Sequence, residues 1–122
     1  MPEEAPVANS MTPGAGGSRE LADAAELFKV LGAEVRLAIV VELAKTPQSV
    51  QELVDTLGVR QPLVSQHLRV LRSARLVTAE RRHRTRLYKL ANNHVRHLVA
   101  DALQHALEHP GEVRDSSRVR AR

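Results

Sequence analysis

The 122-residue sequence contains no cysteine, and this absence excludes several kinds of site. Without thiols there is no disulfide, no thiolate metal centre and no cysteine redox switch. A metal ion held by this chain would therefore need histidine, carboxylate, amide or backbone oxygen ligands. No apolar run approaches the ~20 residues that span a membrane, and the N-terminus lacks the pattern of a secretory signal. We therefore expect a cytoplasmic protein with no membrane partner.

Aromatic residues are almost absent, since Phe28 and Tyr88 are the only two. A protein that binds single-stranded nucleic acid needs aromatic side chains on which the bases stack. Recognition of a duplex needs none, so the composition favours double-stranded DNA over a single strand. The formal net charge of +4 is also consistent with an anionic partner.

The length is sufficient for one domain, and the composition changes near both ends of the chain. Residues 1–17 are rich in proline and glycine, which predicts a flexible arm. Residues 110–122 begin with Pro-Gly and end with three closely spaced arginines, which predicts a basic tail. The apolar periodicity of a folded domain is confined to residues 18–109.

The periodicity predicts a mainly α domain with one small β-hairpin. We expect helices over 18–31, 33–44, 49–57, 61–71 and 92–109, strands over 76–79 and 86–90, and a hairpin tip over 80–85. Ser18 is the expected cap of the first helix. Ser49 and Glu52 have the spacing of a capping box, and Gly58 is suited to ending that short helix. Pro62 suits the first turn of the next helix, where its missing N–H leaves no bond unmade.

The segment from residue 49 to residue 90 predicts a DNA-binding unit. Two helices joined by a tight turn that contains Gly58 form a helix-turn-helix, and the following strands with their basic tip form a wing. Residues 60–89 contain nine lysines and arginines against a single acid, Glu80, for a net charge of +8. The rest of the chain therefore carries −4, so positive charge is concentrated where phosphate contact would require it. The alternative is a solvated basic face on an ordinary helical domain.

The beginning of the second helix of a helix-turn-helix enters the major groove, where glutamine and serine side chains bind base edges. On this helix and the wing we expect ten DNA-binding residues: Gln61, Leu63, Ser65, Gln66, His67, Arg69, Arg72, Arg81, Arg82 and Arg84. The arginines are expected to contact phosphates. Val64, Leu68 and Leu71 are expected to face the core. A lone histidine on a helix is often only a packing residue, so His67 has that alternative.

The last predicted helix contains two histidines whose spacing restricts how they can bind a metal ion. His94 and His105 are eleven residues apart, which places them on one helix face but roughly 16 Å apart. One ion cannot join them within a chain, because metal–nitrogen bonds are about 2 Å long. Two antiparallel copies of the helix would bring His94 of one chain to His105 and Glu108 of the other, at two equivalent sites. Apolar and small residues for such packing are Leu98, Ala102, Ala106 and Leu107.

Several motifs, in order along the chain, resemble those of the ArsR/SmtB family of bacterial metal-sensing repressors. They are Lys29–Ile39, Gln61–Arg72, Ala74–Val77 and Leu87–Leu90. The resemblance covers about residues 20–109 and implies a winged helix-turn-helix homodimer formed through its first and last helices. It further implies that the dimer binds operator DNA without metal and leaves it when metal binds. Arg75 and His83 stand where many members of the family have glycine.

The resemblance also implies a set of metal ligands. Members with a sensor site on the last helix use Asp-x-His near its start and His-x-x-Glu or His-x-x-His near its end, and residues 92–94 and 105–108 occupy those places. The expected ligands are His94, His105, Glu108 and Asn92, with Asp101, His97 and His109 as alternatives. Asparagine replaces aspartate in this pattern, and its neutral amide oxygen is a weaker ligand. The family's other common site uses cysteines, which this chain lacks.

Imidazole and carboxylate ligands favour four-coordinate Zn²⁺, and additional ligands would favour Ni²⁺ or Co²⁺. The sequence therefore predicts a metal-responsive repressor, not an enzyme, with operator DNA and a second copy as partners and no small-molecule substrate. One alternative is a winged-helix repressor without metal sensing, its histidines forming a polar edge of a dimerisation helix. Another is a non-specific architectural DNA-binding protein. A remote alternative is a small metal-dependent hydrolase that uses His94, His105 and Glu108.

Overall fold

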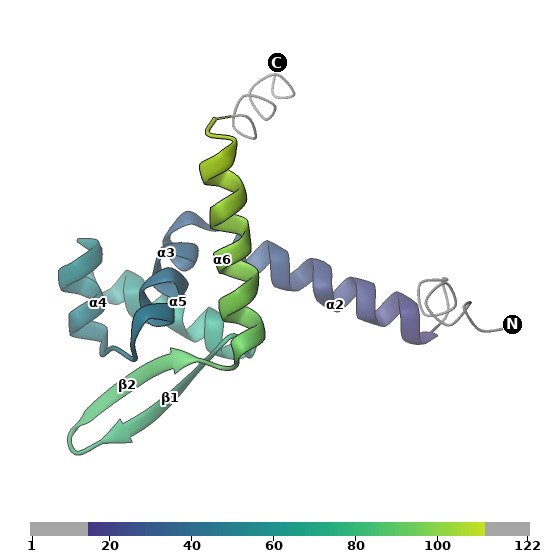
Figure 1. The fold of residues 1–122 in the computed structure, drawn as a ribbon. Coiled ribbons are helices and arrows are strands. Elements are labelled where there is room, and N and C mark those ends of the chain that lie inside the picture. Colours follow the sequence, from purple (N-terminus) through teal and green to yellow (C-terminus); the bar gives the residue numbers. More distant parts are fainter. Residues whose placement is uncertain (1–14, 112–122) are drawn as a thin grey trace, which may run out of the picture.

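The computed structural model describes residues 15–111, which form five helices and one antiparallel hairpin (Figure 1). The elements are α2 (Ala15–Leu31), α3 (Glu34–Lys45), α4 (Val50–Leu57), α5 (Gln61–Ser73), β1 (Val77–Arg82), β2 (Thr85–Leu90) and α6 (Asn93–Glu108). The predicted sequence of elements is therefore confirmed. Most of the predicted arm, 1–17, and of the predicted tail, 110–122, lies outside the described residues. Because α2 begins at Ala15, Ser18 lies inside that helix and the prediction that it caps the helix is wrong.

The helix-turn-helix forms where local chemistry predicts it. The Ser49 hydroxyl accepts a hydrogen bond from the Glu52 N–H at 3.2 Å, and the Ser49 N–H donates to the Glu52 carboxylate at 2.8 Å. This capping box starts α4. Gly58 ends α4 with a φ of 68°, a left-handed conformation that glycine adopts without steric cost. The chain then turns directly into α5, so α4 and α5 have the predicted arrangement.

The wing is longer than the sequence predicts. Val77 pairs with Leu90 at its base and Arg82 pairs with Thr85 at its end, so each strand has six residues. The tip is the pair His83–Arg84, and the prediction of a six-residue tip over 80–85 is wrong. The polar side chains of residues 80–85 led to the prediction of a loop there. In a hairpin that projects into solvent, exposed polar residues can still pair their backbones (Figure 1).

The core lies between the helix-turn-helix, α3, the base of the wing and α6. The central residues of α3 are fully enclosed, since Ile39 and Val40 have no exposed surface. The inward residues of α5 are Val64, Leu68 and Leu71, each at most 1% exposed, as predicted. Val95 and Val99 of α6 complete the same cluster. This packing fixes which face of α5 remains available to a partner.

Gln48, the one buried polar residue in the described part of the chain, connects the wing to the helices. Its N–H donates to the Tyr88 carbonyl at 3.0 Å and its carbonyl accepts from the Tyr88 N–H at 2.8 Å. Its side-chain amide donates to the Glu42 carbonyl in α3 at 2.9 Å. Near the same end of α3, the Arg96 guanidinium of α6 donates to the Ala44 carbonyl. The last helix and the wing are thus both attached to the C-terminal end of α3.

Two long helices, α2 and α6, project from this body (Figure 1). Both carry large apolar side chains that this chain leaves in solvent: Leu21 is 48%, Phe28 59% and Leu107 74% exposed. Burial of such side chains is favourable, so these two helices are the surfaces best suited to a second copy. No helix in the described part of the chain has the length and apolar character that crossing a membrane requires.

Arg75, directly after α5, has a φ of 63°, and His83 has a φ of 60°. These are the two positions at which the resemblance leads one to expect glycine, and left-handed backbone costs other residues roughly 1–2 kcal/mol. We expect Arg75→Gly to raise the free energy of unfolding by about 1 kcal/mol, measured by urea denaturation. The matched control Arg72→Gly, inside α5, should lower it by about 1 kcal/mol. A destabilised Arg75→Gly variant would contradict this account.

Candidate nucleic-acid interface and metal-ligating helix

The outward face of α5 carries most of the predicted base-contacting residues. Gln61, Leu63 and Gln66 are exposed, and Ser65 is half-buried. Leu63 is 41% exposed although it is apolar, which is a surface that contact with a thymine methyl group would cover. The opposite face of α5 is the core face described above, so the helix presents a polar surface from its first two turns.

His67 differs from its neighbours on α5 because it is turned partly inward. Its Nδ1 atom is buried and has no hydrogen-bond partner among the described residues. Burial lowers the pKa of the His67 imidazole, and the nearby positive charge of Arg36 lowers it further. Arg36 is itself held in place because its guanidinium donates to the Val30 carbonyl at 2.7 Å. These observations favour a packing role for a neutral His67, and its contact with a base stays a prediction.

The partly buried imidazole of His67 predicts a pH dependence of stability. Its pKa in the folded chain lies below the ordinary value of about 6.5 expected in the unfolded chain. As pH falls below 6.5 the unfolded chain therefore gains a proton that the folded chain does not, and the free energy of unfolding decreases. We expect wild type to lose more stability between pH 7 and pH 5 than His67→Gln, in urea titrations. His83→Gln controls for the removal of an exposed histidine, and equal losses in wild type and His67→Gln would contradict the prediction.

The arginines of the wing are exposed and differ in their ion pairs. Glu80 lies 3.5 Å from the Arg82 guanidinium and 3.4 Å from the Lys89 ammonium, measured between nitrogen and oxygen atoms. Arg81 and Arg84 have no ion pair within residues 15–111. Exposed ion pairs are weak, so all three predicted arginines can exchange their contacts for phosphate. Arg81 and Arg84 can do so without breaking one.

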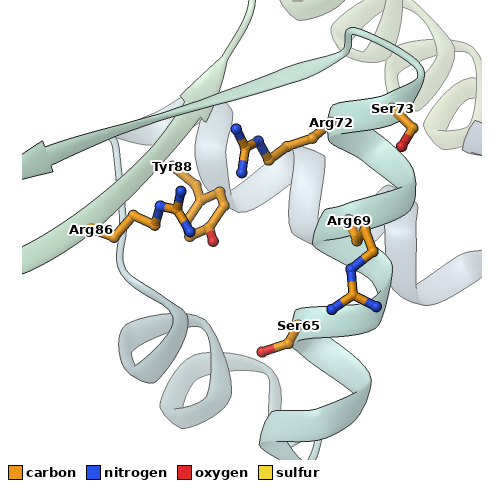
Figure 2. A pocket seen from close by; sticks show the side chains of 6 residues that line it. All are labelled: Ser65, Arg69, Arg72, Ser73, Arg86 and Tyr88. Carbon is orange, nitrogen blue, oxygen red and sulfur yellow. The ribbon is translucent and has the colours of Figure 1, made fainter.

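A hollow of about 540 Å³ separates α5 from β2 (Figure 2). It is lined by Ser65, Arg69, Arg72, Ser73, Arg86 and Tyr88. Ser65, Arg69 and Arg72 are DNA-binding residues predicted from the sequence, whereas Ser73, Arg86 and Tyr88 were not predicted. The spacing of Arg86 and Tyr88 could have identified two of them, because residues two apart on a strand face the same side.

Most of the predicted metal ligands lie near the two ends of α6, and Asp101 lies in the middle of that helix. His94, His97, Asp101, His105 and Glu108 are all exposed. At the C-terminal end the imidazole rings of His105 and His109 lie 4.8 Å apart, measured between ring centres. The Glu108 carboxylate accepts a weak hydrogen bond from the Gln104 amide at 3.3 Å.

Asn92, at the other end, already has a structural role. Its side-chain oxygen accepts a hydrogen bond from the Val95 N–H at 3.1 Å and so caps α6. That oxygen is the atom that would ligate a metal. Asn92, His94, Leu27 and Leu98 border a hollow of about 270 Å³ between the start of α6 and α2. There is consequently space beside His94 for groups from outside this chain.

The described part of one chain does not assemble these ligands. Within residues 15–111, no three side chains of histidine, aspartate or glutamate lie close enough to hold one metal ion. The types of donor nevertheless fit zinc, because imidazoles and a carboxylate on an exposed helix can each provide a ligand. A complete site would therefore need a second copy of the chain, as the spacing of His94 and His105 requires.

Comparisons with known proteins agree with this architecture. The family described as "Bacterial regulatory protein, arsR family" matches residues 33–79. The HTH-type transcriptional repressor SmtB of Mycobacterium tuberculosis is 54% identical over 91 residues, which cover 74% of this chain and 67% of that protein. NmtR, an HTH-type transcriptional regulator of the same organism, is 36% identical over 89 residues, covering 73% of this chain and 74% of that protein.

A solved structure shows the same fold. The homodimeric winged helix-turn-helix DNA-binding domain of Mb0332 from Mycobacterium bovis, described as a possible ArsR-family regulator, superposes with a TM-score of 0.74 at 27% identity. The superposition covers 83% of this chain and 94% of that domain. The hairpin after α5 in this chain thus has the position of a wing.

Proposed function

This chain belongs to the arsR family of bacterial regulatory proteins, and from that premise we propose that it is a metal-responsive transcriptional repressor. In this proposal the metal-free homodimer binds operator DNA and leaves it when zinc binds, with nickel and cobalt as alternatives. One observation carries the proposal: α6 presents exposed His94 and His105 on one face, in a chain whose residues 60–89, which include α5 and most of the wing, carry a net charge of +8. The family consists of transcriptional regulators, so the hydrolase alternative is not taken further.

The homodimer in this proposal is formed through α2 and α6. Their exposed apolar residues include Leu21, Phe28, Leu103 and Leu107, which a second copy would cover. Antiparallel contact between two α6 helices places His94 of one chain next to His105 and Glu108 of its partner. A bound metal ion would supply a cross-link between the two helices there, held by imidazole and carboxylate.

Contacts within one chain support a connection between that site and the DNA-binding unit. Arg96, two residues from His94, donates to the Ala44 carbonyl at the end of α3. Four residues further along, Gln48 pairs through its backbone with Tyr88 of the wing. A displacement of α6 would therefore reach the wing through the short segment from Ala44 to Gln48, which is hydrogen-bonded at both ends. Metal and DNA affinities would then oppose each other by one shared coupling free energy.

The basic wing gives a prediction that separates contacts with phosphates from contacts with bases. Arg81→Ala and Arg84→Ala should each weaken binding to every duplex and reduce the slope of log K against log salt by about one. Gln66→Ala should instead reduce the ratio between affinities for promoter and scrambled DNA. Fluorescence anisotropy over a range of salt concentrations measures both quantities.

Lys45→Ala is the control for the wing variants, because Lys45 lies on α3 and already pairs with Glu42 at 2.9 Å. It should leave the slope unchanged. Wing variants with the wild-type slope would remove the wing from the interface. Equal affinity of wild type for promoter and scrambled DNA at physiological salt would favour the architectural alternative.

One observation favours a regulator that does not sense metal. The Asn92 side-chain oxygen is used to cap α6, whereas a metal-sensing site of the expected pattern would use a side chain at this position as a ligand. In that alternative His94 and His105 form a polar edge of the dimerisation helix. A zinc titration of the protein–DNA complex distinguishes the two functions, because only the metal-sensing regulator would release its DNA.

A further inference from the structure

The hollow between α5 and β2 has an unusual concentration of positive charge. Arg69 and Arg72 approach it from the recognition helix, and Arg86 approaches it from the wing (Figure 2). No acidic residue lines it. None of the three guanidinium groups forms an ion pair with any carboxylate in the described part of the chain. Three unpaired cations around one hollow repel each other, and an anion placed there would relieve that repulsion.

Hydroxyl groups in the same hollow can act as additional donors. The phenol oxygen of Tyr88 points into the space between the two elements, and the Ser65 hydroxyl points into it from α5 (Figure 2). Guanidinium and hydroxyl groups together match the oxygens of a phosphate, which accepts several hydrogen bonds at once.

The wall formed by β2 is rigid. The side chain of Tyr88 is only 8% exposed, and its backbone N–H and carbonyl both bond to Gln48. The opposite wall is α5, whose inner face is packed in the core. Because the backbone of both walls is fixed, binding of an anion has to order only the exposed arginine side chains, which lowers its entropic cost.

We propose that this hollow is a phosphate-binding pocket, formed by Arg69, Arg72, Arg86 and Tyr88, that takes one phosphate of the DNA backbone. The DNA backbone is the source because the pocket opens between the two elements that contact a duplex in the proposed function, on which this inference rests. A captured phosphate would fix the separation of the recognition helix from the wing. Free phosphate offers the same chemistry, and the experiment distinguishes the two sources.

The test compares DNA affinities of Arg86→Gln and Tyr88→Phe with that of Lys89→Gln by anisotropy. Lys89 lies on the same strand, carries the same charge and points to the opposite side, so it is the matched control. Tyr88→Phe keeps the buried ring and removes only the hydroxyl. Each pocket variant should weaken binding about tenfold, the value of one hydrogen bond to a charged group. Lys89→Gln should have less than a twofold effect in ~150 mM salt, where an exposed charge outside the contact is screened.

A double variant tests whether the pocket residues share one phosphate. Arg69→Gln with Arg86→Gln should cost less than the product of the two single losses, because the first substitution already releases the shared anion. Independent phosphates would give multiplicative losses and overturn the pocket. If wild type binds DNA tightly but the pocket variants match Lys89→Gln, the pocket proposal is overturned and the proposed function stands.

An NMR titration with inorganic phosphate distinguishes failure of the phosphate pocket from failure of the proposed function. Saturable shifts of the Arg86 and Tyr88 signals that chloride does not reproduce at equal ionic strength would support the pocket even in a chain that fails to bind DNA. That result would overturn the proposed function and identify free phosphate as the source. A chain that binds neither DNA nor phosphate overturns both proposals.

Discussion

Zinc is expected to weaken the binding of wild-type protein to its promoter DNA by about 5–150-fold, and His105→Ala is expected to abolish that effect. The physical reason is that, in the proposed function, His105 supplies a ligand that only the metal-bound arrangement of α6 uses. The substitution removes an exposed imidazole, which contacts the ring of the equally exposed His109, so the fold should be preserved. Fluorescence anisotropy of a labelled promoter duplex, titrated with zinc at a fixed salt concentration, measures both proteins.

His83→Ala is the matched control for this experiment. It removes one histidine from the tip of the wing, outside α6, and should leave the ratio of affinities with and without zinc unchanged. If zinc changes neither wild type nor His105→Ala while both bind DNA tightly, the same titration is made with nickel and cobalt. No response to any of the three metals would leave the regulator without metal sensing, with His94 and His105 structural.

Much of the fold could be predicted because short-range chemistry determines it. Ser49 and Glu52 form their capping box within four residues, and Gly58 ends α4 by its own backbone freedom. Val64 and Leu68 are four residues apart on one helix face, so their burial follows from periodicity alone. None of these predictions depends on a distant part of the chain.

What could not be predicted depends on residues far apart in the sequence. The role of Gln48 required knowing that Tyr88, forty residues later, lies beside it. The pocket residues Arg86 and Tyr88 become a site only because α5 lies opposite the strand that carries them. The length of the wing was missed because polarity at Glu80 and Arg81 indicates exposure, and exposure does not distinguish a loop from a strand in solvent.

The ligands of the metal site were predicted from the motifs of the family resemblance, but its position between two subunits was predicted from an incompatibility. His94 and His105 share a helix face but are too far apart to ligate one ion, and no group of three such ligands forms in the described part of one chain. A second copy of α6 resolves the incompatibility only if the helices are antiparallel, so that each site takes one imidazole from each chain. Ligation between subunits and ligation within one chain therefore predict different numbers of tight zinc sites in dimers assembled from two variants.

Mixed dimers test that arrangement directly. In a His94→Ala homodimer, and in a His105→Ala homodimer, each of the two sites lacks one imidazole. Loss of a ligand should cost at least ~100-fold in zinc affinity, since even the loss of a group that only orients a ligand costs 10–100-fold. A dimer with one subunit of each variant has one site with both imidazoles and one with neither. Mixing the two inactive variants should therefore restore one tight zinc site per mixed dimer, measured by competition with a zinc chelator.

The reciprocal mixture carries the same two substitutions and predicts the opposite result. When wild type is paired with the double variant His94→Ala, His105→Ala, ligation between subunits leaves each site with one imidazole, and no tight site remains. Ligation within a chain would instead preserve one tight site in this dimer and none in the first mixture. Purification with two different affinity tags isolates each mixed dimer, so both have equal composition and differ only in which chain carries which histidine. Tight zinc binding by the second mixture and not by the first would overturn the antiparallel arrangement, because the number of histidines is the same in both.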